Sequence, residues 1–383
     1  MTETKLNYPK SDFETFVQVL DGTKKSDRVL YSELLVDEEI KEVILRRIFG
    51  EEYYPPPIEQ WGPEKLAVPT YHEKKAHYAN YYRQAVRFWD LLGYPLFPDL
   101  TFITNFESMN AMGNKTDDTA LLSKGERYWA SEGTGMIRCW KDFERFPWER
   151  AHGYIDEYGA YLDIIQEFLP PHMKIGIVGT LFEEPLEWIL GYEGFFYMLK
   201  DQPDLVEAVF SKVGDIMLAF YESVIGHESV GCIFHADDLG YKSGTFISVG
   251  DLQRLVFPWF KKYASLAHRH RKPFYLHSCG NKDEIMDILI DEIPIDAIHA
   301  FEDESYPVTR YKKTWGGRVG IIGGVDLDKL SRLDEQQLRE YIRGVLEACM
   351  EDGRYVFGSG NSITNYVPIK NYLTMLDEAI NWH

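Results

Sequence analysis

The stretch PFYLHSCGNKDEIMDILID, residues 273–291, holds in one piece the pattern that decides the fold. Its first four residues form an apolar run between Pro273 and the later Gly280, which is typical of a short buried strand. Gly280 allows the backbone to turn sharply, and Asn281 can cap a helix over residues 282–291. We therefore expect a buried strand followed directly by a helix.

His277 and Cys279 stand at the end of this strand, two residues apart. Because strand side chains alternate between faces, both should project to the same side. A neutral imidazole and a thiolate placed in this way make half of a tetrahedral zinc site. The alternative is structural, since Cys is common as a small core residue and one nearby His does not by itself indicate a metal.

Strands and helices alternate along most of the chain. The clearest helices are expected over residues 203–225, 251–270, 282–291 and 335–351. Strand–helix alternation produces a parallel sheet, and eight such strands close into a barrel, so we predict an α/β protein with a single (β/α)8 TIM barrel. The eight strands are expected at residues 101–105, 136–140, 174–179, 231–236, 274–277, 295–299, 319–323 and 355–358.

The first part of the chain has a different pattern. Apolar residues recur at helical spacing over residues 37–49 and again over 71–92. We expect residues 1–95 to form an N-terminal helical extension packed on the barrel, and residues 96–383 to form the barrel itself.

The composition restricts the class of protein. The formal net charge of −20 argues against a nucleic-acid partner. The four Cys residues are scattered, which predicts a reducing cytoplasm and no structural disulfides. Neither a signal peptide nor a run of about 18 apolar residues is present, so we expect no membrane association.

Acidic and imidazole side chains gather where the predicted strands end, which is the face that carries the chemistry of such barrels. Of the adjacent pair Asp237 and Asp238, only one can face the site, and we expect Asp237 because it shares its parity with His235. The residues at these strand ends are Glu183, Glu184, His235, Asp237, Asp238, His277, Cys279, His299, Glu302, Asp303, Asp326 and Asn361.

Several motifs resemble the uroporphyrinogen decarboxylase superfamily. They are DDLG at 237–240, HSCGN at 277–281, GGVDLDKL at 323–330 and GSGNSI at 358–363. The HxCG element resembles the cobamide-dependent methyltransferase branch, in which the His and Cys hold zinc on an α/β barrel. The resemblance therefore implies zinc on His277 and Cys279, and a corrinoid supplied by a partner protein.

The chain departs from both branches at one place. In the methyltransferases a second Cys after the eighth strand completes the zinc site, and the decarboxylases carry a His there, whereas this chain has Asn361. A third ligand would then be Asp237, Glu302 or Glu183, since zinc accepts carboxylates. A site with fewer thiolates is a harder Lewis acid, better suited to polarising an ether oxygen than to activating a thiol.

Three functions compete. The first is a cytoplasmic, zinc-assisted methyltransferase that moves a methyl group between a small substrate, such as a methoxylated aromatic compound, and a corrinoid protein. In it His277, Cys279 and Asp237 are the expected metal ligands, and Asp237, Glu302 and Asn361 the expected catalytic residues. The second is a uroporphyrinogen-type decarboxylase that uses Asp99, and the third is a metal-free barrel with a binding role. The resemblance also implies a homodimer.

Overall fold

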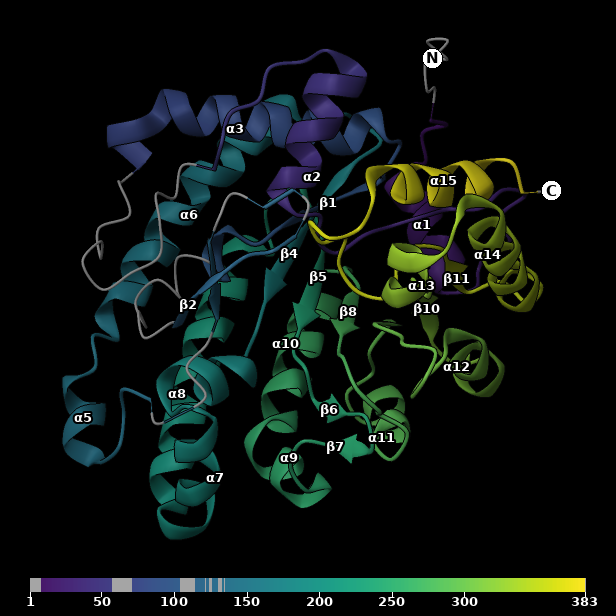
Figure 1. The fold of residues 1–383 in the computed structure, drawn as a ribbon. Coiled ribbons are helices and arrows are strands. Elements are labelled where there is room, and N and C mark those ends of the chain that lie inside the picture. The colour runs from purple at the N-terminus through teal and green to yellow at the C-terminus, as the bar shows by residue number, and fades with distance from the viewer. Residues whose placement is uncertain are drawn as a thin grey trace.

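A curled, all-parallel sheet forms the centre of the computed structural model, which describes residues 8–56, 71–103, 114–120, 122–123, 126–129, 133 and 135–382 (Figure 1). Its strands lie in the order β1-β4-β5-β8-β9-β10-β11, so neighbours in the sheet follow one another along the chain. Their bounds are Leu96–Asp99 (β1), Lys174–Gly179 (β4), Val230–Ala236 (β5), Phe274–His277 (β8), Ala297–His299 (β9), Gly320–Ile322 (β10) and Tyr355–Val356 (β11).

Helices cover the outer face of this sheet (Figure 1). Outward strand residues such as Ile233 and Phe274 pack against them; the Phe274 ring, for example, lies 6.4 Å from that of Phe260 on α10. The helices after the first strand are α5 (Trp140–Arg145), α6 (Glu149–Phe168), α7 (Tyr192–Asp201), α8 (Pro203–Val224), α9 (Val249–Leu255), α10 (Phe257–Arg269), α11 (Met286–Asp291), α12 (Val308–Trp315), α13 (Leu327–Arg332), α14 (Glu335–Met350) and α15 (Ile369–Ile380), with a π-helical turn at Glu184–Ile189.

Further elements precede the barrel or project from it. The N-terminal part contains α1 (Phe13–Leu20), α2 (Glu38–Val43), a π-helical turn at Ile44–Phe49 and α3 (Tyr71–Leu91). Two antiparallel hairpins pair β2 (Asn114–Asp117) with β3 (Glu126–Trp129), and β6 (Gly240–Tyr241) with β7 (Gly244–Thr245). The second hairpin follows β5 directly and so lies next to the carboxyl end of the sheet.

The inward side chains form a separate apolar cluster inside the curled sheet. Val178, Phe234 and Tyr275 belong to it, each from a different strand. Helix α1 closes the amino end of this interior, since Phe16 is fully buried in the same cluster and meets the Tyr275 ring edge-on at 6.0 Å. Only the opposite, carboxyl end is therefore left for chemistry.

The N-terminal part of the chain also pairs with the sheet. Tyr31 forms a parallel bridge with Phe357, just after β11; Phe357 N donates to Leu30 O at 2.8 Å and Ser32 N to Phe357 O at 2.9 Å. Leu30 shares the inner cluster with Leu96 of β1. The segment around Tyr31 thus occupies an eighth position beside β11 that the sequence did not predict.

The predicted TIM-barrel-like α/β fold is confirmed, but the first two predicted strands are wrong. Residues 101–103 are helical, 104–105 lie outside the described residues, and the strand is Leu96–Asp99. Pro98 argues against a strand by pattern, yet it is tolerated in β1, the edge strand of the sheet. Residues 136–139 form no strand, and α5 begins at Trp140.

The helix expected over residues 282–291 begins later, at Met286. Asn281 does not cap it; instead the side-chain oxygen of Asn281 accepts from Asp283 N at 3.0 Å in a local turn. In the part of the chain that the structure describes, no helix is both long and apolar enough to cross a membrane.

Candidate metal centre

Two histidines point into the barrel at its carboxyl end. Tyr275 of β8 and Ala297 of β9 belong to the inner cluster, so His277 and His299, each two residues further along, face the same interior. Both side chains are buried, and His299 is fully so. The alternation of faces along two short strands therefore delivers two imidazoles to one place.

The loops after β5 and β8 bring two more polar groups to these histidines. Gly240 and Gly280 pack backbone against backbone, and Gly280 has φ +81°. A Cβ added at Gly280 would lie 2.0 Å from the carbonyl carbon of Gly240, so no side chain fits between the loops. This close approach places Asp238 beside Cys279, whose backbone N donates to Asp238 Oδ1 at 2.8 Å.

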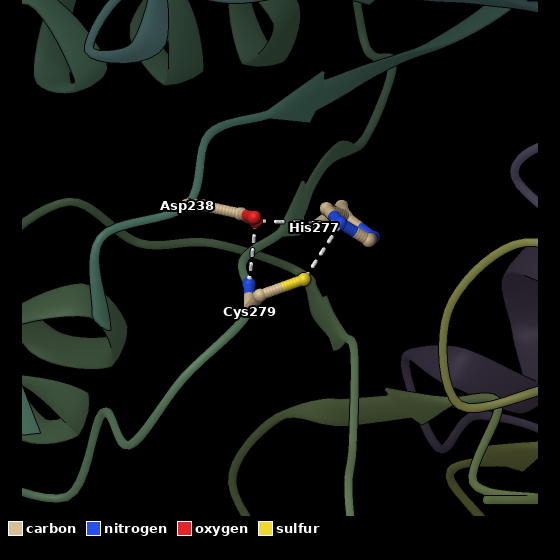
Figure 2. Close-up of side chains that lie close together, drawn as sticks. All are labelled: Asp238, His277 and Cys279. Carbon is tan, nitrogen blue, oxygen red and sulfur yellow. Dashed lines mark hydrogen bonds and ion pairs between the residues drawn. The ribbon is translucent and has the colours of Figure 1, made fainter. Parts of the chain in front are cut away.

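Asp238, His277 and Cys279 turn their ligand atoms toward one another (Figure 2). His277 Nε2 lies 3.5 Å from Cys279 Sγ and 3.6 Å from Asp238 Oδ1. All three ligand atoms lie within 4.8 Å of one another. One nitrogen, one sulfur and one oxygen thus converge at the mouth of the barrel.

The two separations from His277 Nε2 fit zinc. Ordinary zinc bonds of about 2.0–2.3 Å in a tetrahedral site separate a nitrogen from a sulfur by about 3.5 Å and from a carboxylate oxygen by about 3.4 Å. The observed separations of 3.5 and 3.6 Å match these values. Three protein ligands would leave the fourth position open, as in catalytic rather than structural zinc sites.

The electrostatics of the group also suit a cation. Burial, together with the negative charge of Asp238, raises the pKa of the Cys279 thiol well above its usual range. Burial alone would raise the pKa of Asp238 as well, but the nearby His277 ring and the hydrogen bond from Cys279 N outweigh it and lower that pKa. The carboxylate is therefore charged, and the sulfur needs a positive ion beside it to become a thiolate.

Two further side chains support Cys279 and its loop. Asn361 Nδ2 donates to Cys279 Sγ at 3.0 Å. The buried ammonium group of Lys282 donates to the backbone oxygens of Ser278, Gly280 and Ala300 at 2.7, 3.0 and 3.1 Å. Burial lowers the pKa of Lys282 to about 8. The sequence suggested only a helical position for Lys282, since nothing in the pattern shows three carbonyls turned toward it.

Comparison with known proteins is decisive for the family. The profile described as uroporphyrinogen decarboxylase (URO-D) matches residues 187–382, which include every residue of the candidate metal centre. The chain belongs to the uroporphyrinogen decarboxylase family. The resemblance inferred from the sequence motifs is confirmed at this level.

One solved structure agrees with the fold of this family member. A methyltransferase from Methanosarcina mazei superposes with a TM-score of 0.62 at 16% identity, covering 97% of this chain and 98% of that one. A putative vitamin-B12 independent methionine synthase from Listeria monocytogenes gives a TM-score of only 0.43 at 12% identity, covering 94% of this chain and 97% of that one. A search of curated protein sequences finds no match.

Asp237 lies near the centre but faces away from it. Its fully buried carboxylate accepts from Thr180 Oγ1 at 2.6 Å, from the backbone N of Phe182 at 2.8 Å, and contacts His235 Nε2 at 2.8 Å. His235 and Asp237 do share a face, as expected, but it is the outer face of β5, where His235 packs against α10. Asp238, rather than Asp237, is the carboxylate that the structure brings to His277 and Cys279.

Glu302 and Asn361 line a cleft of about 580 Å3 next to the metal centre. Glu302 lies 3.9 Å from Lys242 and is not among the converging ligand atoms. Asn361 belongs both to the cleft and, through its contact with Cys279, to the metal centre. The other charged residues of the cleft are Asp303, Glu304, Asp326, Asp328 and Lys329.

Asp99 lies in a different cavity, of about 330 Å3, between β1 and the N-terminal helices. Its carboxyl group is buried, accepts from Thr101 Oγ1 at 2.8 Å and bonds to the Tyr158 hydroxyl. Burial raises the pKa of Asp99. Aromatic rings dominate the lining, and Lys41 is the only basic side chain among the described residues that line it.

Proposed function

We propose that this protein is a zinc-assisted methyltransferase that moves a methyl group between a small methylated substrate and a corrinoid carried by another protein. The observation that carries the proposal is the convergence of His277 Nε2, Cys279 Sγ and Asp238 Oδ1 at the mouth of the barrel. The family includes decarboxylases, but a cofactor-free decarboxylase would have no use for the metal site that these three groups could make.

The residues of the centre have distinct roles in this proposal. His277, Cys279 and Asp238 would hold zinc, which supplies Lewis acidity toward the oxygen that loses the methyl group. Asn361 donates an N–H to the sulfur and so withdraws electron density from the thiolate. The bound zinc would then remain a harder Lewis acid. Glu302, in the adjoining cleft, is the proposed source of the proton for the departing oxygen.

The cleft beside Asn361 supports a small substrate. Its volume of about 580 Å3 lies in the range of small-molecule sites. Its lining holds five carboxylates and two lysines, so its potential disfavours an anionic ligand. A neutral or cationic methyl ether, with a ring of benzene size, fits this cleft better than a substrate with several carboxylates.

A partner must supply the corrinoid. The sequence contains no DxHxxG segment of the kind that holds one. Tyr241, on the β6–β7 hairpin that adjoins the Cys279 loop, is exposed and belongs to the rim that a partner would meet. A homodimer in the cytoplasm remains a prediction.

Metal analysis of the full chain is the first test. We expect about one zinc per chain in the wild type and none in a His277→Ala/Cys279→Ala variant. Cys139→Ala is the matched control, because it removes an exposed thiol, at the N-cap position of α5, that takes no part in the centre. Equal zinc in the double variant and the control would overturn the proposed site.

Methyl transfer is the second test. Wild-type protein with zinc, free cob(I)alamin and a panel of neutral and cationic aryl methyl ethers should form methylcobalamin, followed by its absorbance, and the double variant should not. Parallel incubation with uroporphyrinogen should release no carbon dioxide. Release of carbon dioxide that survives the double variant but is lost in Asp99→Asn would favour the decarboxylase instead.

A further inference from the structure

The two inward-facing histidines are bonded to each other. His277 Nδ1 lies 2.7 Å from His299 Nδ1, and their ring centroids are 4.9 Å apart. Two nitrogens at this distance share one hydrogen, so one ring donates and the other accepts. Which ring donates decides which nitrogen of His277 keeps a free lone pair.

The backbone of Ser359 settles this question. His299 Nε2 lies 3.3 Å from Ser359 O, and a carbonyl oxygen can only accept, so His299 carries its hydrogen on Nε2. The His299 ring is fully buried, and its two nitrogens contact another imidazole and a carbonyl oxygen rather than a carboxylate, so the neutral ring is the stable form. A neutral His299 with hydrogen on Nε2 has a bare Nδ1, and His277 must therefore donate from its own Nδ1.

The consequence reaches the metal centre. A neutral His277 that carries hydrogen on Nδ1 presents a lone pair on Nε2, the nitrogen that faces Cys279 Sγ and Asp238 Oδ1. Only this tautomer of His277 can bind a metal at that position. The imidazole is thus prepared for its ligand role by a neighbour that contacts no ligand atom.

Ser359 is itself held in place from the far end of the chain. Ser359 N donates to Glu33 Oε1 at 2.8 Å, and the Ser359 hydroxyl bonds to the other oxygen of the same carboxyl group. Burial raises the pKa of Glu33 to about 8, so the group is mostly protonated and uncharged at neutral pH. The carbonyl that orients His299 is therefore fixed by a buried, neutral contact.

We propose that His299 is a positioning residue that, anchored by Ser359, fixes His277 as the tautomer with a free Nε2. The part of this inference that concerns metal rests on the function proposed above. The part that concerns the tautomer holds for the protein without any metal, and the two can be tested separately.

Nitrogen-15 NMR of the histidine-labelled, metal-free full chain tests the tautomer directly. His277, assigned by its loss in His277→Gln, should show a protonated Nδ1 and a bare Nε2. His235 is an internal control with the opposite pattern, because its Nε2 faces the Asp237 carboxylate and its Nδ1 the Tyr221 hydroxyl. A His277 that carries its hydrogen on Nε2 in the wild type would overturn the inference.

Two variants of His299 test its consequence for metal. His299→Leu removes the acceptor, so His277 should populate both tautomers, and Co2+ affinity, read from its visible absorption bands, should fall about 10- to 100-fold. His299→Asn keeps an acceptor near the Nδ1 position and should restore most of the affinity. If the Leu variant does not fold, the wild-type spectrum and the metal affinity of the Asn variant still test the positioning role of His299.

The outcomes separate this inference from the proposed function. Unchanged Co2+ affinity and an unchanged His277 spectrum in a folded His299→Leu protein would refute the positioning role, even if methyl transfer is observed. The expected tautomer in the wild type together with no methyl transfer to any corrinoid would refute the function and leave the positioning role intact.

Discussion

Adjacent carboxylates with opposite roles allow a sharp test of the site, because Asp237 and Asp238 can each be changed to Asn without altering size. Asp237 is fully buried and serves the turn after β4, whereas Asp238 is partly exposed and faces His277 and Cys279. We expect Asp237→Asn to reduce stability and Asp238→Asn to reduce metal affinity. Each variant is the control for the other.

The magnitude for Asp237→Asn follows from its donors. The carboxylate accepts from Thr180 Oγ1 and from the backbone N of Leu181 and Phe182, at 2.6 to 3.0 Å. Asn keeps one acceptor oxygen and turns an N–H2 toward the remaining donors, and each buried donor left unsatisfied costs about 1–3 kcal/mol. We therefore expect a loss of about 3–5 kcal/mol in the free energy of unfolding.

Calorimetry and metal titration read out the two effects. For a chain of 383 residues the unfolding entropy is about 0.8 kcal/mol per kelvin, so Asp237→Asn should lower Tm by about 5 °C. Asp238→Asn keeps an oxygen for Cys279 N and should change Tm by about 1 °C or less, while zinc affinity falls at least about 100-fold. If Asp237→Asn loses zinc at unchanged Tm and Asp238→Asn retains it, the two roles are reversed and the reasoning is refuted.

Three further changes test the frame around the centre. The Glu33 pKa of about 8 exceeds the unfolded value of 4.5, so folded protein holds the proton more tightly and stability should fall as pH rises from about 5 to 8, by at most about 1.4 kcal/mol per unit. Denaturant titrations of Glu33→Gln should lack this slope, and an equal slope in both proteins would contradict it. Gly280→Ala should abolish metal binding, measured by zinc content, because its Cβ collides with Gly240; full zinc content would show that the loops can separate. Lys282→Met leaves three carbonyls without a donor and should cost about 3–5 kcal/mol in urea unfolding, and a loss below 1 kcal/mol would contradict that.

The sequence predicts the parts of the fold that depend on short-range pattern. Strand β8 and the strand at Lys174–Gly179 appear with the expected bounds, because apolar runs between turn residues leave little choice. The segment around Tyr31 was not predicted as a partner of the sheet, because its bridge to Phe357 depends on residues more than 300 positions away. The residue pattern of a short stretch of sequence cannot reveal a partner so far away along the chain.

The candidate site was likewise predicted where it depends on local strand geometry and missed where it depends on the tertiary fold. The common side of His277 and Cys279 follows from strand geometry, and the structure brings both to one point. Parity correctly pairs His235 with Asp237 but does not say which face of β5 is the inner one. Which face is the inner one depends on how the sheet curls. Phe234 lies in the inner cluster, so His235 and Asp237, at odd-numbered separations from it, lie on the outer face. Asp238 could therefore be identified as the carboxylate of the site only from the three-dimensional arrangement of the strands.

The bond between Glu33 and Ser359 joins residues 326 positions apart, and this separation has a consequence for biosynthesis. While the nascent chain is still emerging from the ribosome, His277 and Cys279 are exposed long before the Ser359 carbonyl is made. Until then His277 has no fixed tautomer and Cys279 lacks the amide of Asn361. We therefore expect the proposed zinc to be loaded only after chain completion, and truncation at either end to yield a protein that does not bind it.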